Sequence, residues 1–178
     1  YQLNDLFATA KSSLNPLFGY DENAKTFREY YENNSSDKII NKYTGIFEGK
    51  NVIVIHAESI QNFTLDASIN GVDVAPNLKK LASEGLYFSN FYAQESVGTS
   101  SDSEFTFNTS LMPASNGTVF VSYWDREYVT IPKLLKEKGY YTFSMHANNG
   151  TFWNRNTMHE TLGYQRFYSK NDYEIDEW

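Results

Sequence analysis

Three short segments hold the side chains that could do chemistry in this chain. They are residues 56–59 (HAES), residues 98–104 (GTSSDSE) and residues 146–155 (HANNGTFWNR). The first and third follow apolar runs that predict strands, and the second precedes a predicted helix. Because ligands of open α/β sheets collect at the carboxyl ends of strands, we expect the three segments to lie at one edge of a sheet.

Glu58 lies three residues after the apolar run 52–55, at the end of a predicted strand. A carboxylate in that place is a good ligand for a hard metal ion. The same side chain could instead lie at a helix N-terminus and complement the helix dipole. The residues alone leave both interpretations open.

The second segment places three hydroxyl side chains, Thr99, Ser100 and Ser101, before the acids Asp102 and Glu104. Such a pattern can cap a helix. It can equally place a nucleophilic hydroxyl at the positive end of a helix, where anions bind and where a metal or base would activate it. The chain has no GxSxG elbow, so an α/β-hydrolase triad is not supported.

The third segment combines polar side chains with Trp153 and Arg155. Arginine binds phosphate through two parallel hydrogen bonds, and tryptophan offers a flat apolar wall. The alternative is a loop whose tryptophan packs on the sheet. His56 falls inside the strand pattern of residues 51–57, of which 52–55 are the apolar run, and His159 falls in the middle of a predicted helix, so we expect structural roles for both.

The elements that must position these segments alternate between strands and helices, which predicts an α/β domain with a mostly parallel sheet between helices. Short apolar runs predict the strands at residues 52–55, 86–91 and 140–145. Apolar residues at helical spacing, bounded by Pro and Gly, predict four helices. The first starts at Pro76 and stops at Gly85, and the others span residues 100–111, 131–138 and 151–162. Phe105 and Leu111 are expected to face inward.

Residues 1–50 have a different character and predict a helical arm or a linker from a preceding membrane segment. Apolar residues recur at helical spacing between Leu3 and Leu14, and a second short helix is expected around residues 27–31. Residues 51–178 are then the domain that holds the three segments.

Composition excludes several classes of protein. The formal net charge of -7 disfavours nucleic-acid binding and electrostatic adhesion to an anionic lipid surface. The absence of cysteine excludes disulfides and thiolate metal sites. Aromatic residues make up 17% of the 178 residues, which supplies enough apolar area for a packed core and argues against disorder.

Taken together, five stretches resemble the lipoteichoic acid synthase family of phosphoglycerol transferases, in the sulfatase and alkaline phosphatase-like superfamily. They run collinearly between about residues 50 and 170: NVIVIHAESIQ at 51–61, VAPNLKKL at 74–81, GTSSDSEFTFNTSL at 98–111, YYTFSMHANNGTFWNRN at 140–156 and LGYQRFY at 162–168. The SDSEF and TFWNR elements are the most specific of these matches.

The resemblance implies an enzyme on the extracellular face of the cell membrane, tethered by an N-terminal transmembrane region and also released after cleavage. It implies transfer of glycerol phosphate from phosphatidylglycerol, through a covalent Ser or Thr intermediate, onto the polyglycerol phosphate of lipoteichoic acid. Residues 51–178 would be the first half of the sulfatase-like catalytic domain. Because the family's downstream Asp-His metal pair has no match here, we expect this piece to be inactive alone.

Residue by residue, the resemblance assigns Glu58 and Ser100 to a metal ion, Mn²⁺ or Mg²⁺. Ser100 stands in the nucleophile column, where the family usually has Thr, and Thr99 beside it is the alternative. Substrate binding is assigned to four further residues: His146, Asn148, Trp153 and Arg155. Asn148 departs from the family's Asp and removes one charge near the substrate.

Two other functions are compatible with these motifs. One is a related phosphoethanolamine or sulfate-ester enzyme of the same superfamily, although the chain lacks the C-x-P-x-R signature of sulfatases. The other is a non-catalytic module that binds a glycerol phosphate polymer.

Overall fold

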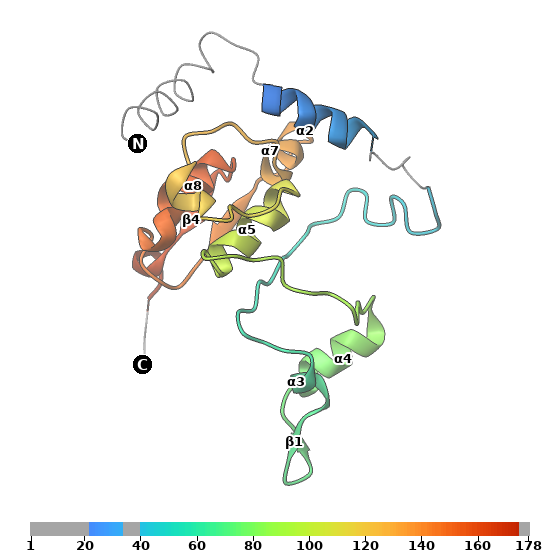
Figure 1. Ribbon diagram of the computed structural model, residues 1–178. Helices are drawn as coiled ribbons and strands as arrows, with labels where there is room; N and C mark the ends of the chain where they lie inside the picture. Colours follow the sequence, from blue (N-terminus) through green and yellow to red (C-terminus); the bar gives the residue numbers. More distant parts are fainter. Residues whose placement is uncertain (1–21, 34–39, 175–178) are drawn as a thin grey trace. The chain divides into compact units, whose positions relative to one another are not determined.

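The computed structural model describes residues 22–33 and 40–174 (Figure 1). These residues belong to two compact units. The first unit ends at Ile53 and contains helix α2, Glu22–Asn33, and turns over residues 42–49. The short helix expected around residues 27–31 is confirmed as part of α2. The helix expected between Leu3 and Leu14 lies outside the described residues.

The second unit begins at Val54 and contains all the remaining elements. In chain order these are α3 Phe63–Asp66, β1 Ser68–Ile69, β2 Val72–Asp73, α4 Pro76–Glu84, α5 Ser100–Thr109, α6 Val119–Ser122, α7 Ile131–Glu137, β3 Phe143–Met145, η1 Phe152–Asn154, α8 Arg155–Thr161, β4 Arg166–Tyr168 and η2 Lys170–Asp172.

Three predicted helices are confirmed as α4, α5 and α7. Helix α4 starts at Pro76 and ends before Gly85, as its boundary residues require. The Thr130 hydroxyl caps α7 by accepting the N–H of Lys133 at 3.3 Å. Gly139, just beyond α7, has a φ of 83°, a value that favours glycine.

The helix expected at residues 151–162 is instead broken into η1 and α8. Trp153 and Asn154 have φ values of 56° and 55°, in the left-handed region. A right-handed helix cannot continue through two such residues, so the chain turns there and α8 begins afresh at Arg155.

The third predicted strand is confirmed in shorter form as β3, which pairs in parallel with β4. Phe143 lies opposite Arg166, and Met145 lies opposite Tyr168. Helix α8 connects the two strands, as a parallel pair requires a crossover. Strands β1 and β2 form a separate antiparallel hairpin.

The strands expected at residues 52–55 and 86–91 are wrong for this structure. Neither run is assigned to a strand, and Val52 to Ile55 are between 54% and 87% exposed. An apolar run becomes a strand only when a neighbour pairs with it and buries its faces. Within the described part of the chain, neither run has such a neighbour.

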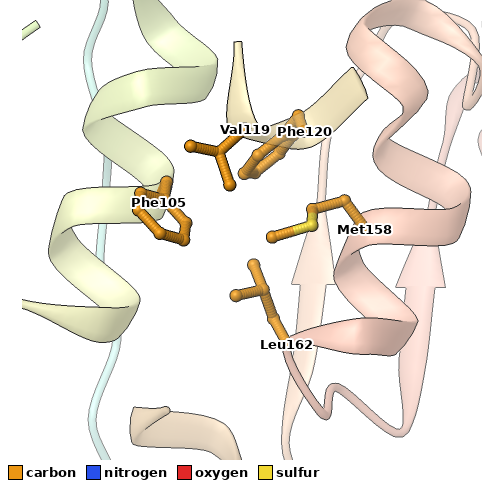
Figure 2. Packing of buried hydrophobic residues seen from close by; sticks show 5 residues of the cluster. All are labelled: Phe105, Val119, Phe120, Met158 and Leu162. Carbon is orange, nitrogen blue, oxygen red and sulfur yellow. The ribbon is translucent and has the colours of Figure 1, made fainter. Parts of the chain in front are cut away.

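The core lies between α5, α6 and α8 (Figure 2). Its buried apolar residues are Phe105, Val119, Phe120, Met158 and Leu162. The inward position of Phe105 is thus confirmed. Leu111 was expected to face inward, but it lies two residues beyond the end of α5 and is 38% exposed. This core fixes the starts of α5 and α8 with respect to each other, and both starts carry candidate residues.

Candidate active site

The start of α5 is built on a strained residue. Ser100 is the first helical residue, and Thr99 before it has a φ of 44° and a ψ of -112°. A β-branched residue rarely adopts such a conformation, and the structure must hold it there. The Thr99 side chain makes no capping hydrogen bond, so the interpretation of the hydroxyl run as a helix cap is wrong at this residue.

Asp102 holds the loop that precedes the helix. Its buried Oδ2 atom accepts the N–H groups of Ser96 at 3.0 Å and of Gly98 at 2.9 Å. A Cβ atom on Gly98 would lie only 2.3 Å from Asp102 Oδ1, so this position requires glycine. From the sequence, Asp102 was interpreted as part of a helix cap. Its position two residues after Ser100 was the signal that could have indicated its role in holding the loop.

The structure brings Ser100 and Arg155 together. Arg155 is the first residue of α8 and is completely buried, and its Nη2 atom lies 3.4 Å from Ser100 Oγ. Trp153, two residues earlier, is half-buried against the core. The Asn154 amide between them donates to the carbonyl of Phe120 at 2.9 Å and so ties the turn to α6.

Glu104 binds Arg155 from the next turn of α5. Arg155 Nη2 donates to Oε1 of Glu104 at 2.6 Å, and Nε donates to Oε1 at 3.0 Å and to Oε2 at 3.2 Å. Burial by itself would raise the pKa of Glu104. Hydrogen bonds from His159 and Arg155, together with the charges of both, outweigh burial and hold that pKa at about 2. The carboxylate is therefore ionised at neutral pH.

His159 completes the contacts of Glu104. Its Nε2 atom lies 2.9 Å from Glu104 Oε2, and its Nδ1 atom lies 2.7 Å from the hydroxyl of Ser144 on β3. The structural role expected for His159 agrees with its position in α8, where it is 5% exposed. We refer to Glu104, Arg155, His159 and Ser144 as the Glu104 network. Sequence reasoning missed this network, because its members come from three elements.

His146 follows β3 and is half-buried. Burial lowers the pKa of its imidazole, and the nearby charge of Arg155 lowers it further, while Glu104 and Glu58 act in the opposite direction. Its Nδ1 atom accepts the N–H of Asn148 at 3.1 Å. Asn148 itself is exposed, and its side-chain oxygen accepts the N–H of the next residue at 2.7 Å.

Glu58 lies in an exposed turn, and α3 begins only at Phe63. No helix starts at Glu58, so its interpretation as a helix N-terminal acid is wrong. His56, two residues earlier, is not in a strand, and its Nε2 atom lies 2.9 Å from the hydroxyl of Ser103. That contact joins the first segment to α5, three residues from Ser100.

Glu58 and Ser100 offer oxygen donors, the type that Mn²⁺ and Mg²⁺ prefer. Among residues 22–33 and 40–174, no group of three His, Cys, Asp or Glu side chains could hold a metal ion. The two residues fit part of a hard-metal shell, and their role as ligands stays a prediction. In the same part of the chain, no helix is long and apolar enough to cross a membrane.

Comparisons with known proteins find relatives that match most of this chain. The chain is 40% identical over 159 residues to lipoteichoic acid synthase 2 of Bacillus subtilis, a match that covers 88% of this chain and 24% of that protein. It is 38% identical over 140 residues to the lipoteichoic acid synthase of Staphylococcus aureus, covering 76% of this chain and 22% of that protein. The chain therefore spans about a quarter of the length of these relatives.

The fold is also found in solved structures. The lipoteichoic acid synthase LtaP of Listeria monocytogenes superposes with a TM-score of 0.60 at 29% identity, over 62% of this chain and 27% of that one. An alkaline phosphatase superfamily protein of Vibrio parahaemolyticus gives 0.51 at 26% identity, over 58% and 25%. The profile of the Sulfatase family matches residues 50–178. This chain belongs to the Sulfatase family, has a partial alkaline phosphatase-like α/β fold, and is similar to the lipoteichoic acid synthases.

Proposed function

We propose that the protein containing this chain is a metal-dependent phosphoglycerol transferase that builds the polyglycerol phosphate of lipoteichoic acid. The observation that carries the proposal is the 3.4 Å approach of Arg155 Nη2 to Ser100 Oγ at the N-terminus of α5. A hydroxyl at a helix N-terminus beside a guanidinium suits attack on a phosphodiester. The similarity to proteins named lipoteichoic acid synthases supports the same reaction class.

In the first half-reaction, the Oγ atom of Ser100 attacks the phosphorus of phosphatidylglycerol. A bond forms between that oxygen and phosphorus, and the bond from phosphorus to the diacylglycerol oxygen breaks. The serine hydroxyl proton ends on the departing oxygen, which leaves as diacylglycerol. Glycerol phosphate then remains attached to Ser100 as a phosphodiester.

In the second half-reaction, the terminal hydroxyl of a polyglycerol phosphate chain attacks the same phosphorus. The bond to Ser100 breaks, the serine oxygen takes up the proton of the attacking hydroxyl, and the acceptor is one glycerol phosphate longer. Ser100 is favoured over Thr99 as the nucleophile because Arg155 contacts the Ser100 hydroxyl, whereas the Thr99 side chain is exposed.

Glu58 and Ser100 would hold the Mn²⁺ or Mg²⁺ ion together with residues that lie outside this chain. When bound, such an ion supplies Lewis acidity and a lower pKa for the hydroxyl it binds. Glu58 is exposed, and the contact between His56 and Ser103 keeps its segment beside α5.

The third segment would bind the substrate around Ser100. Trp153 is packed against the core, so its ring can act as a fixed wall that orients the glycerol. The lowered pKa of His146 keeps its imidazole neutral at neutral pH, which suits hydrogen bonding to glycerol hydroxyls. Asn148 is exposed beside it and would offer a neutral amide. The whole enzyme would work on the extracellular face of the membrane, attached through a transmembrane segment and also released by cleavage.

The test is turnover by the full-length protein in lipid vesicles. With Mn²⁺ present, vesicles of phosphatidylglycerol should yield diacylglycerol and polyglycerol phosphate, while vesicles of phosphatidylethanolamine should yield neither. Turnover of phosphatidylethanolamine alone would establish the phosphoethanolamine alternative. Binding of polyglycerol phosphate without any diacylglycerol release would establish the non-catalytic module.

A further inference from the structure

The Glu104 network raises a question that the proposed reaction does not answer, namely how a completely buried arginine keeps its orientation toward Ser100. The side chain of Arg155 is 1% exposed, and the side chain of Glu104 is 15% exposed. In such surroundings a guanidinium needs a charged partner, because an unpaired buried charge is costly. Glu104 supplies that partner, and its position relative to Ser100 determines which way the paired guanidinium faces.

Glu104 and Ser100 lie four residues apart on α5, so both point from the same face of the helix. Arg155 spans them. Its Nε and one side of Nη2 are taken by the Glu104 carboxylate, while Nη2 also lies 3.4 Å from Ser100 Oγ. The Nη1 atom is held separately, 3.4 Å from the carbonyl of Phe152. The guanidinium is planar, so fixing these edges also fixes the N–H that faces the serine.

Glu104 is itself held from the other side. Because an ionised carboxylate can only accept hydrogen bonds, His159 must carry a hydrogen on Nε2, the atom 2.9 Å from Glu104. In the neutral ring Nδ1 is then an acceptor, and the Ser144 hydroxyl, 2.7 Å away, can donate to it. The contacts from Ser144 on β3 through His159 on α8 to Glu104 on α5 therefore fix the position of the carboxylate and the tautomer of the neutral imidazole.

We propose that Glu104 is a positioning residue for the transfer reaction: with His159 and Ser144 behind it, its carboxylate orients the guanidinium of Arg155 toward the hydroxyl of Ser100. This inference rests on the proposed function, but the orientation of Arg155 can be measured without it. The Glu104 carboxylate is bonded to Arg155 and His159, so it acts on the Ser100 hydroxyl through Arg155.

The first measurement follows Arg155 by NMR in full-length protein labelled with ¹⁵N-arginine, with its signals identified by their loss in Arg155→Lys. In the wild type, the Arg155 Nε–H should exchange slowly with solvent and its guanidinium should rotate slowly. Both properties should be lost in Glu104→Gln, because an amide has one acceptor oxygen and offers N–H groups that repel the guanidinium. An unchanged Arg155 signal in that variant would overturn the proposal, whatever the enzyme's substrate.

The second measurement is steady-state diacylglycerol release, expressed per folded protein. Glu104→Gln should lower kcat by about 10²-fold and leave KM within about threefold, because the guanidinium acts on charge that develops during attack. Asp172→Asn is the matched control: Asp172 Oδ1 also lies 2.6 Å from an arginine Nη2, that of Arg166, but outside the network. That variant should keep the wild-type kcat.

Glu104→Asp keeps the proposal testable if the glutamine variant does not fold. The aspartate side chain is one methylene shorter, so it should hold Arg155 less firmly. Its kcat should lie between those of the wild type and of Glu104→Gln. Immobilisation of Arg155 and kcat should fall together in every folded variant. A variant that loses immobilisation but keeps kcat would refute a positioning role. So would a loss of kcat with Arg155 still immobile. Absence of turnover in the wild type, with Arg155 immobile, would refute the proposed function instead.

Discussion

The guanidinium of Arg155, at the start of α8, lies 3.4 Å from the hydroxyl of Ser100, at the start of α5. The two residues are 55 positions apart in the sequence, and the core shared by the two helices holds their starts side by side. This contact places a cation at the hydroxyl that the family resemblance selects as nucleophile.

Removal of the Ser100 hydroxyl should abolish transfer. Ser100→Ala in the full-length protein should lower the rate of diacylglycerol release by at least about 10³-fold, as for other removed nucleophiles. Thr99→Ala is the matched control and should cost far less, because Arg155 contacts Ser100 alone of the two. Full activity of Ser100→Ala together with an inactive Thr99→Ala would transfer the role of nucleophile to Thr99.

Glu104 should make the protein sensitive to acid. Its pKa is about 2 in the folded state against an ordinary value of 4.5, so the unfolded state binds the proton more readily. The stability from this carboxylate is then fully present above about pH 4.5 and is lost as the pH falls toward 2. Its partners are Arg155 and His159, which face it from α8.

Urea unfolding of the full-length protein at several pH values measures this effect. Across that pH window, the free energy of unfolding of the wild type should fall by on the order of 1–3 kcal/mol more than that of Glu104→Gln. The glutamine variant should already be less stable at pH 6, because it leaves the buried Arg155 without a charged partner. If the unfolding free energies of the two proteins changed in parallel with pH, Glu104 would not be an ionised partner of Arg155 in the folded state.

The loop before α5 should not tolerate a side chain at Gly98. In Gly98→Ala the new Cβ would meet Asp102 Oδ1 at 2.3 Å and Ser101 Oγ at 2.8 Å, so the loop or the helix start must move. We expect a loss of about 1–3 kcal/mol in unfolding free energy. Gly150→Ala is the control, since its Cβ would meet its nearest neighbour, Ser169 Cβ, at an ordinary 3.4 Å. Equal stability of the two variants would contradict the close approach of Asp102.

His146 should titrate below the ordinary histidine value of 6.5, because burial and the charge of Arg155 both disfavour its protonated form. Two-dimensional NMR of the metal-free protein measures its pKa directly. Glu58→Gln removes a charge that raises this pKa, so the variant should titrate lower still. A wild-type pKa above 6.5 would contradict the burial of His146 beside Arg155. A rise of that pKa in Glu58→Gln would contradict the effect of the Glu58 charge on His146.

Glu58 should be required for the metal ion. Glu58→Ala in the full-length protein should lose both bound manganese and turnover, and it should remain folded because the Glu58 side chain is exposed. Elemental analysis after dialysis gives the manganese content of each protein. Unchanged metal content in the variant would remove Glu58 from the metal shell.

The helices were more predictable than the strands for a physical reason. Proline and glycine set the ends of α4 and α7 through local backbone preferences, which a sequence displays. The strand expected at residues 52–55 depends on a neighbour that the described residues do not supply, so the apolar run remained exposed. The break before α8 rests on left-handed values at Trp153 and Asn154, which residue type does not reveal.

The candidate site was predictable as a set of residues but not as a set of contacts. The resemblance assigned Ser100 and Arg155 to one site, as nucleophile and substrate-binding residue, but it did not predict a direct contact between their side chains. The role of Glu104 depends on Arg155, 51 positions away, and on His159, for which the sequence predicted only a structural role. Contacts between distant elements arise from packing, which neither spacing nor composition encodes.

The central claim, covalent transfer through Ser100, is tested most directly by trapping the intermediate. Full-length protein would be mixed with Mn²⁺ and phosphatidylglycerol in the absence of an acceptor chain, quenched in acid, digested and sequenced by mass spectrometry. The account predicts a glycerophosphate adduct on Ser100 in the peptide that contains residues 98–104, and none in Ser100→Ala. Diacylglycerol release with no adduct on Ser100, or with the adduct on Thr99, would contradict it.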